Sequence, residues 1–219
     1  MFITGYSASS NIVAMTLADL ASSHSHYFEK NSDRMEIIAA MLVAANYDYV
    51  SSMNLLEKSS FMGNIYSRLF VIQFKEFNHA NEQMHNRIEN IDEVMECQLI
   101  SEYDHAAYKL NGFDSMESIY ERMSPKRILS DIPVPMITII GKDDPLYLYG
   151  KGAVQDDIDL EHHTKNKNIL FIEPSHGNHF GFYGGSFFDM FSNDLCYRYP
   201  VQIALVLVES VLTIGGGTE

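Results

Sequence analysis

The chain has 219 residues, enough for one domain with a sizeable hydrophobic core. Hydrophobic residues make up 46% of the chain and charged residues 20%, which excludes a disordered or fibrous protein. The formal net charge of −14 excludes nucleic acid as a partner, because phosphate binding needs a basic surface. The two cysteines, Cys97 and Cys196, supply neither a disulfide framework nor a CxxC metal motif.

The amino terminus carries no predicted leader, because residues 1–4 contain neither a basic segment nor a long apolar core. The longest apolar stretch, Val201–Ile214, is interrupted by Gln202 and Glu209 and is shorter than the ~20 residues that span a bilayer. We therefore expect a soluble chain that ends in a helix and a flexible tail at residues 215–219.

The predicted elements alternate between strands and helices along the chain. Four short apolar runs are predicted strands: Met1–Thr4, Ile37–Ala45, Met136–Ile140 and Asn168–Ile172. Helical spacing of apolar residues is found at Asn11–Leu20, through much of Val50–Met123, and after Pro200. This alternation predicts an α/β fold, with a parallel sheet covered by helices on both faces.

The helical stretch between the second and third strands is too long for a simple crossover connection. It predicts a helical cap inserted at about residues 48–130 into a single domain of residues 1–214. Within this stretch Ile65, Leu69, Ile72 and Phe77 are spaced to line one face of a helix.

The first candidate for chemistry is Gly5-Tyr6-Ser7-Ala8-Ser9, which lies between a predicted strand and a predicted helix. A nucleophile elbow is a sharp strand-to-helix turn of pattern G-x-S-x-G, in which small neighbours let substrate approach the serine. Here Ser9 takes the place of the last glycine. Alternatively, Ser7 only caps the helix that follows, as serine commonly does.

The second candidate is an acidic turn, Gly141-Lys142-Asp143-Asp144-Pro145, directly after the third predicted strand. The carboxyl ends of parallel strands are where such sheets place their active sites. Either aspartate has the chemistry to orient a histidine, and the alternative is a plain turn, a frequent use of Asp and Pro.

The third candidate is the glycine-rich loop His176-Gly177-Asn178-His179-Phe180-Gly181-Phe182 after the fourth predicted strand. A histidine here is able to accept a proton from a nucleophile. Alternatively both histidines are ordinary loop residues, or an H-x-x-H metal pair. Because no third ligand is near in the sequence, we expect neither a metal nor a cofactor.

The three signals occur in the order Ser, Asp, His, each after a predicted strand, which is the order of the triad in α/β-hydrolases. In this order the chain resembles the AB-hydrolase-4 esterases, which include the abhydrolase-domain proteins one, two and three and bacterial YheT-like hydrolases. The segments similar to this family's elbow and cap start are Gly5–Ile12, Asn46–Asp48, Leu56–Glu57 and Asn64–Tyr66. Those similar to its later motifs are Gly112–Ser115, Ile119–Tyr120, Ser124, Ile132–Pro135, Asp143–Pro145 and Asn178–Phe182.

The resemblance implies a serine hydrolase that cleaves carboxylic esters, including lipid esters, through an acyl-enzyme. It implies Ser7 as nucleophile, His179 rather than His176 as base, and Asp144 as the acid that orients it. It further implies that the Ala8 backbone N–H supplies half of the oxyanion hole. The cap would line an acyl pocket.

The family pattern differs from this sequence at two places. Its elbow reads G-x-S-x-G-G-N, and both later glycines are serine here, Ser9 and Ser10. The resemblance also implies about four strands and a second oxyanion donor ahead of Ser7, so we expect an amino-terminally truncated chain that is the carboxy-terminal half of the fold. A membrane anchor would likewise belong to the missing segment. The alternative hypotheses are an inactive fragment and a catalytically dead interaction module of hydrolase ancestry.

Overall fold

The computed structural model describes residues 1–21, 37–58, 61–81, 91–107, 114–144, 146, 166–175, 177 and 179. The chain divides into two compact units, each considered by itself below. Unit 1 comprises Met1–Tyr47, Pro125–Asp144 and Tyr149–Glu219, and unit 2 comprises Asp48–Ser124 and Pro145–Leu148.

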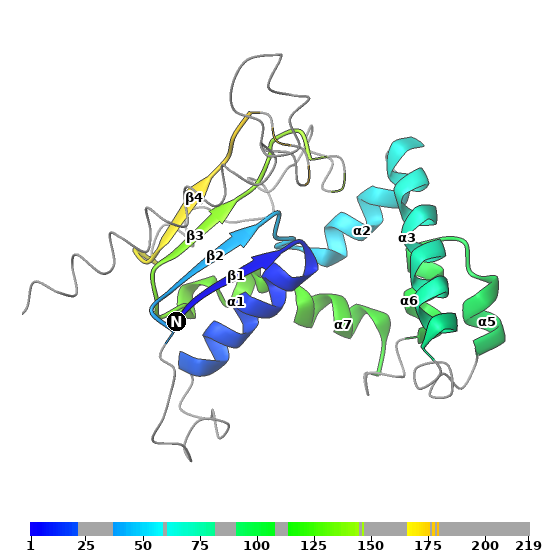
Figure 1. Ribbon diagram of the computed structural model, residues 1–219, viewed down its shortest axis with the longest axis horizontal. Helices are drawn as coiled ribbons and strands as arrows, with labels where there is room; N and C mark the ends of the chain where they lie inside the picture. The colour runs from blue at the N-terminus through cyan, green and yellow to red at the C-terminus, as the bar shows by residue number, and fades with distance from the viewer. Residues whose placement is uncertain are drawn as a thin grey trace, which may run out of the picture. The chain divides into compact units, whose positions relative to one another are not determined.

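Unit 1 is built on a four-stranded sheet of β1 (Phe2–Tyr6), β2 (Ala39–Val43), β3 (Met136–Ile139) and β4 (Ile169–Ile172) (Figure 1). The strands are ordered β1-β2-β3-β4, and each neighbouring pair is parallel. All four carboxyl ends therefore lie at the same edge of the sheet. The predicted α/β fold class is confirmed.

The core of unit 1 forms where α1 (Ala8–Ala21) packs against β1 and β2. Its buried apolar residues recur at helical spacing, and they are Val13, Ala14, Leu17 and Ala18. Every residue of β2 is buried, as expected of an apolar strand with a neighbour on each side. The terminal helix expected after Pro200 lies outside the described residues.

The centre of this core contains one polar pair. The Tyr47 hydroxyl is hydrogen-bonded to Thr138 Oγ1, and both side chains are buried. Burial raises the pKa of Tyr47, because the phenolate would lose its hydration. The pair thus satisfies two hydroxyl groups that would otherwise be costly to bury.

β1 lies at one edge of the four strands. Ser7 N donates to Val43 O at 2.8 Å, so Ser7 faces β2. Because successive residues of a strand alternate in direction, the backbone groups of Thr4 and Tyr6 point away from β2. Within the described ranges no strand pairs with that side of β1.

Unit 2 is helical among its described residues. Its helices are α2 (Tyr49–Lys58), α3 (Phe61–Ala80), α5 (Ile91–Glu96), α6 (Ile100–Ala107) and α7 (Met116–Met123). A small core contains Leu56 of α2, Val71 of α3, Cys97 directly after α5 and Ile100 of α6. Helix α7 begins with a capping box, in which the Ser115 and Ser118 hydroxyls each accept from the other residue's backbone N–H.

The chain leaves unit 1 after Tyr47 and re-enters it at the short helices η2 (Pro125–Arg127) and η3 (Leu129–Asp131). In unit 1, Lys126 N donates to Tyr47 O at 3.3 Å. In unit 2, Tyr49 N donates to Ser124 Oγ at 2.9 Å. The exit and the return are therefore neighbouring points of the backbone. The cap role expected for residues 48–130 stays a prediction.

Helices long and apolar enough to cross a bilayer are not found in the described part of the chain.

Candidate active site

Ser7 occupies a one-residue turn between the end of β1 and the start of α1. Its φ of 52° lies in the left-handed region, which is uncommon for a residue with a side chain. Two backbone bonds hold the turn, from Ser7 N to Val43 O at 2.8 Å and from Ser10 N to Ser7 O at 2.9 Å. This is the strand–serine–helix turn that the Gly5-Tyr6-Ser7 motif predicts.

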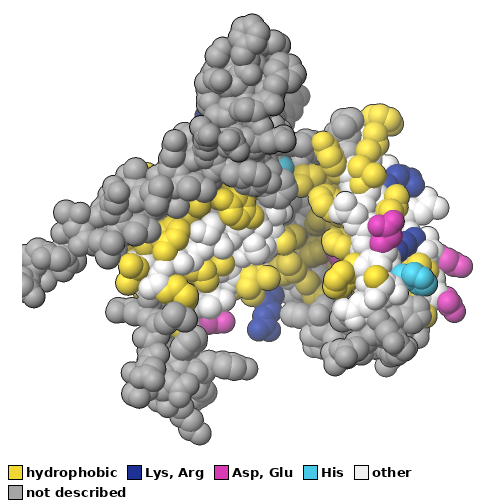
Figure 2. Space-filling view, in the orientation of Figure 1, with side chains coloured by type: hydrophobic (Ala, Val, Ile, Leu, Met, Phe, Trp, Pro, Cys, Tyr) yellow, Lys and Arg dark blue, Asp and Glu magenta, His cyan; other side chains and the backbone are white. Residues whose placement is uncertain are grey.

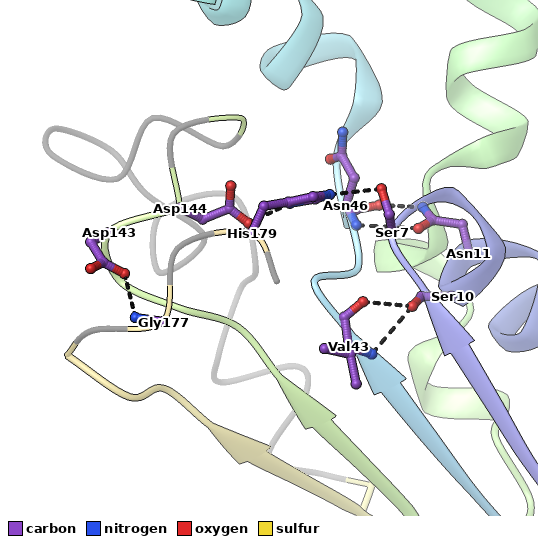
Figure 3. Close-up of polar contacts among 9 residues, drawn as sticks. All are labelled: Ser7, Ser10, Asn11, Val43, Asn46, Asp143, Asp144, Gly177 and His179. Carbon is purple, nitrogen blue, oxygen red and sulfur yellow. Dashed lines mark hydrogen bonds and ion pairs between the residues drawn. The ribbon is translucent and has the colours of Figure 1, made fainter. Parts of the chain in front are cut away.

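His179 lies between Ser7 and Asp144 and contacts both (Figure 3). The distance from His179 Nε2 to Ser7 Oγ is 2.8 Å, and from His179 Nδ1 to Asp144 Oδ2 it is 2.7 Å. The structure thus brings together the three residues that the motifs single out, from positions that follow β1, β3 and β4.

The direction of the two hydrogen bonds follows from the chemistry of the groups. An ionised carboxylate can only accept, so His179 donates from Nδ1 to Asp144. Nε2 of the neutral ring then accepts a hydrogen bond from the Ser7 hydroxyl. Asp144 is 1% exposed and His179 is 6% exposed, so little water competes for either bond.

Asp143, the other acid of the turn, has a different contact. Its Oδ1 accepts from Gly177 N at 2.8 Å (Figure 3). A second bond, from Lys142 N to Pro174 O at 2.9 Å, ties the same two loops. Of the two aspartates that the sequence left open, Asp144 therefore contacts the histidine, while Asp143 anchors the loop that carries it. His176 lies outside the described residues.

Ala8 is the first residue of α1. The N–H groups in the first turn of a helix have no carbonyl partner within the helix, and they attract negative charge. The Ala8 N–H thus lies next to Ser7 at the start of α1, and its oxyanion role stays a prediction.

Ser10, Asn11 and Asn46 lie in segments that resemble the family's motifs, but the sequence does not show the contacts by which they support the turn. The buried amide of Asn11 donates to Asn46 O and accepts from Asn46 N at 3.2 Å. The hydroxyl of Ser10 bonds to the backbone of Val43. These contacts join α1 to β2 and to the segment that follows it, across more than 30 positions of sequence, which a local motif does not contain.

The described residues contain no group of three or more His, Cys, Asp or Glu side chains arranged to hold a metal ion. The contact seen for Ser7 Oγ is with His179 Nε2, and the roles of nucleophile and base stay predictions.

The chain is an α/β protein with a parallel sheet. Ser7, Asp144 and His179 follow its strands in the order of the triad in α/β-hydrolases.

Comparison with curated proteins gives the same relatives as the motifs. The chain is 34% identical over 83 residues to "Monoacylglycerol lipase ABHD2" of Bos taurus and 32% identical over 83 residues to that of Homo sapiens. Each match covers 38% of this chain and 19% of the relative. It is 29% identical over 121 residues to "Abhydrolase domain-containing protein 2" of Drosophila melanogaster, covering 53% of this chain and 28% of that protein. The predicted resemblance to abhydrolase-domain proteins is confirmed, over a small part of their length.

No protein-family model matches the chain. Among solved structures, esterase B from Lactobacillus rhamnosis aligns with a TM-score of 0.48 at 12% identity, covering 96% of this chain and 51% of that one. A thermostable carboxyl esterase from Bacillus coagulans aligns with a TM-score of 0.42 at 16% identity, covering 96% of this chain and 64% of that one.

Proposed function

We propose that this chain carries the triad of a serine hydrolase that cleaves carboxylic esters. The observation that carries the proposal is the continuous line of hydrogen bonds from Asp144 through His179 to Ser7. A serine hydroxyl is a weak nucleophile until a neighbouring base removes its proton, and His179 is the base in contact with it.

In the proposed reaction Ser7 Oγ attacks the ester carbonyl carbon while His179 Nε2 accepts its proton. The tetrahedral intermediate collapses, the bond to the alcohol oxygen breaks, and His179 returns the proton to the leaving alcohol. Water then attacks the acyl-enzyme, gives its proton to His179, and releases the carboxylic acid as Ser7 is reprotonated. Asp144 stabilises the imidazolium in both steps, and the Ala8 N–H donates to the oxyanion.

The substrate class that we propose is an ester of a lipid or another acyl group. Its support is the name of the mammalian relatives, monoacylglycerol lipases, together with the similarity to them over 83 residues.

The test is labelling of the purified chain by a fluorophosphonate probe, which reacts with activated serines. We expect the wild-type chain to label and Ser7→Ala and His179→Ala to lose labelling. Ser130→Ala is the matched control, because this exposed hydroxyl bonds only locally, to Asp131 at 3.0 Å. A wild-type chain that stays folded and does not label contradicts the proposal. Labelling that survives in Ser7→Ala contradicts the assignment of the nucleophile.

A further inference from the structure

The buried hydroxyl of Ser10 ties the Ser7 turn to the neighbouring strand. Ser10 is completely buried, and its Oγ donates to Val43 O at 2.9 Å and accepts from Val43 N at 3.3 Å (Figure 3). Val43 O also accepts from Ser7 N at 2.8 Å. One carbonyl group of β2 therefore holds both Ser7 and the residue three positions after it.

The hydroxyl of Ser9 ties the other side of the turn. Ser9 Oγ accepts from Tyr6 N at 2.8 Å and donates to Tyr6 O at 2.7 Å. These backbone groups of Tyr6 point away from β2. Ser9 thus provides a hydrogen-bond partner for both Tyr6 N–H and Tyr6 C=O. Among the described residues, no strand pairs with this side of β1.

The two serines act on a residue that needs such support. The left-handed φ of 52° at Ser7 costs free energy, and a strained residue keeps its conformation only when its surroundings over-determine it. Tyr6 precedes Ser7 and is held by Ser9, while Val43 bonds to Ser7 itself and is held by Ser10. Neither glycine nor alanine at positions 9 and 10 is able to make these bonds.

We infer that Ser9 and Ser10 are positioning residues, whose hydroxyls hold the Ser7 turn so that Ser7 Oγ stays in reach of His179. The inference rests on the proposed function of Ser7 as nucleophile. Ser9 and Ser10, which replace the two later glycines of the G-x-S-x-G-G-N motif, then hold the turn in a second way. They are not a sign of lost activity.

The kinetic test compares Ser10→Ala, Ser9→Ala and Ser9→Thr with the wild-type chain on a short-chain p-nitrophenyl ester, with rates per titrated active site. For both alanine variants we expect kcat to fall about 10–100-fold, since a displacement of about 1 Å at a reacting atom costs ~10²-fold. KM should stay within about twofold. Ser9→Thr should restore the rate, because position 9 is exposed and the hydroxyl is retained.

Thr16→Ala is the matched control. Thr16 lies on the same helix, and its hydroxyl partner among the described residues is Ile12 O one turn back, at 2.8 Å. We expect its kcat to equal that of the wild-type chain. Wild-type kcat in both alanine variants, or an equal loss in Thr16→Ala, overturns the inference while leaving the proposed function in place.

A structural measurement separates the inference from the proposed function. Crystal structures of the wild-type chain and of Ser10→Ala give the distance from Ser7 Oγ to His179 Nε2, which is 2.8 Å here, without any need for activity. We expect this contact to lengthen beyond hydrogen-bonding distance in the variant. A variant that keeps it contradicts the positioning role, whatever the wild-type chain does to an ester.

Discussion

Gly5 occupies a place on β1 where a side chain has no room. A Cβ at this position would lie 2.5 Å from Ser10 Cα, 2.7 Å from Ser10 N and 2.8 Å from Ser9 O. All three are backbone atoms of the first turn of α1, so relief of the clash requires the turn itself to move. The glycine thus permits the close approach of strand and helix that brings Ser7 to His179.

Gly5→Ala is therefore expected to lower the rate of fluorophosphonate labelling by about 100-fold, because the nucleophile is displaced. It should also destabilise unit 1 by roughly 1–3 kcal/mol, as overpacking does. Labelling time courses and urea denaturation measure the two effects. Thr4→Ala on the same strand is the control, since Thr4 is exposed, and it should change neither. Equal labelling by Gly5→Ala and the wild-type chain would show that the turn has room to adjust.

The two aspartates after β3 should respond differently to removal of their charge. Asp144→Asn gives His179 Nδ1 an amide partner that can impose the wrong tautomer, a change that costs ~10⁴-fold in kcat in a comparable triad. Asp143→Asn keeps a carbonyl oxygen that accepts from Gly177 N–H. The hydrogen bond changes from a charged to a neutral acceptor, so we expect kcat to fall by about tenfold or less. Ester hydrolysis by the two variants measures the difference. A larger loss in Asp143→Asn would reverse the assignment of the acid.

At the scale of single residues, the sequence predicts the residues of the motifs but not the hydrogen bonds that hold them in place. Ser7, Asp144 and His179 each follow a recognisable apolar run, so their place at the sheet edge was predictable. The bonds from Ser10 to Val43 and from Gly177 to Asp143 join residues 33 and 34 positions apart. Such partners depend on which strands become neighbours, and a local pattern does not contain that information.

At the scale of elements, continuous apolar runs located the strands to within one or two residues. Met136–Ile140 was expected and β3 is Met136–Ile139, because a strand that is buried on both faces is largely apolar. Helical periodicity was a poorer guide to burial. On α3 the side chains of Leu69, Ile72 and Phe77 are 50%, 52% and 59% exposed, and hydrophobic side chains gather over this helix in the view of Figure 2. Spacing predicts a helix but not which of its faces is covered.

The alternating direction of the backbone N–H groups along β1 should be measurable by amide hydrogen exchange. Gly5 N–H shares the direction of Ser7 and pairs with β2, so we expect it to exchange slowly, while Thr4 N–H should exchange quickly. Tyr6 points the same way as Thr4 but donates to Ser9 Oγ, so it should be protected. In Ser9→Ala the Tyr6 amide should become as fast as Thr4, with Met41 in β2 unchanged. Fast exchange of Tyr6 in the wild-type chain contradicts this prediction.

At the scale of the whole molecule, unit 2 contains a buried carboxyl group, that of Asp104. In unit 2 the Tyr120 hydroxyl donates to Asp104 Oδ2 at 2.6 Å. Burial raises the pKa of Asp104 to about 6, against the lowering effect of this hydrogen bond, and the charge of Glu57 adds to the rise. Burial and the nearby charge of Asp104 raise the pKa of Tyr49 to about 12. Folding therefore brings a carboxyl group into a place where its ionised form is disfavoured.

The sign of the pH effect follows from this direction. The Asp104 carboxyl stays protonated to a higher pH in the folded chain than in the unfolded chain. The contribution of this group to the free energy of unfolding is therefore fully present below about pH 4 and is lost as the pH rises through about 6. Asp104→Asn should thus stabilise unit 2 at pH 7.5 relative to pH 4, by roughly 2–3 kcal/mol. Hydrogen exchange in α6 and α7 measures it, with exposed Glu96→Gln as control. An effect that is equal at both pH values contradicts the assignment.

The general architecture was predictable because strands and helices alternate in the sequence and the inserted segment is rich in helical spacing. The separation into two cores was not, because the core residues of unit 2, such as Leu56 and Cys97, come from segments with no shared pattern. Their grouping depends on the turns between the helices.

The adjacency of the points where the chain leaves and re-enters unit 1 makes the segment Asp48–Ser124, the larger part of unit 2, exchangeable. Because Lys126 N bonds to Tyr47 O, a short turn is enough to bridge the two ends of unit 1. Because Tyr49 N bonds to Ser124 Oγ, the two ends of the segment are equally close. Insertions with neighbouring ends are tolerated by the host fold. Recombination at these two joints would let this segment be swapped between related chains while Ser7, Asp144 and His179 are inherited unchanged.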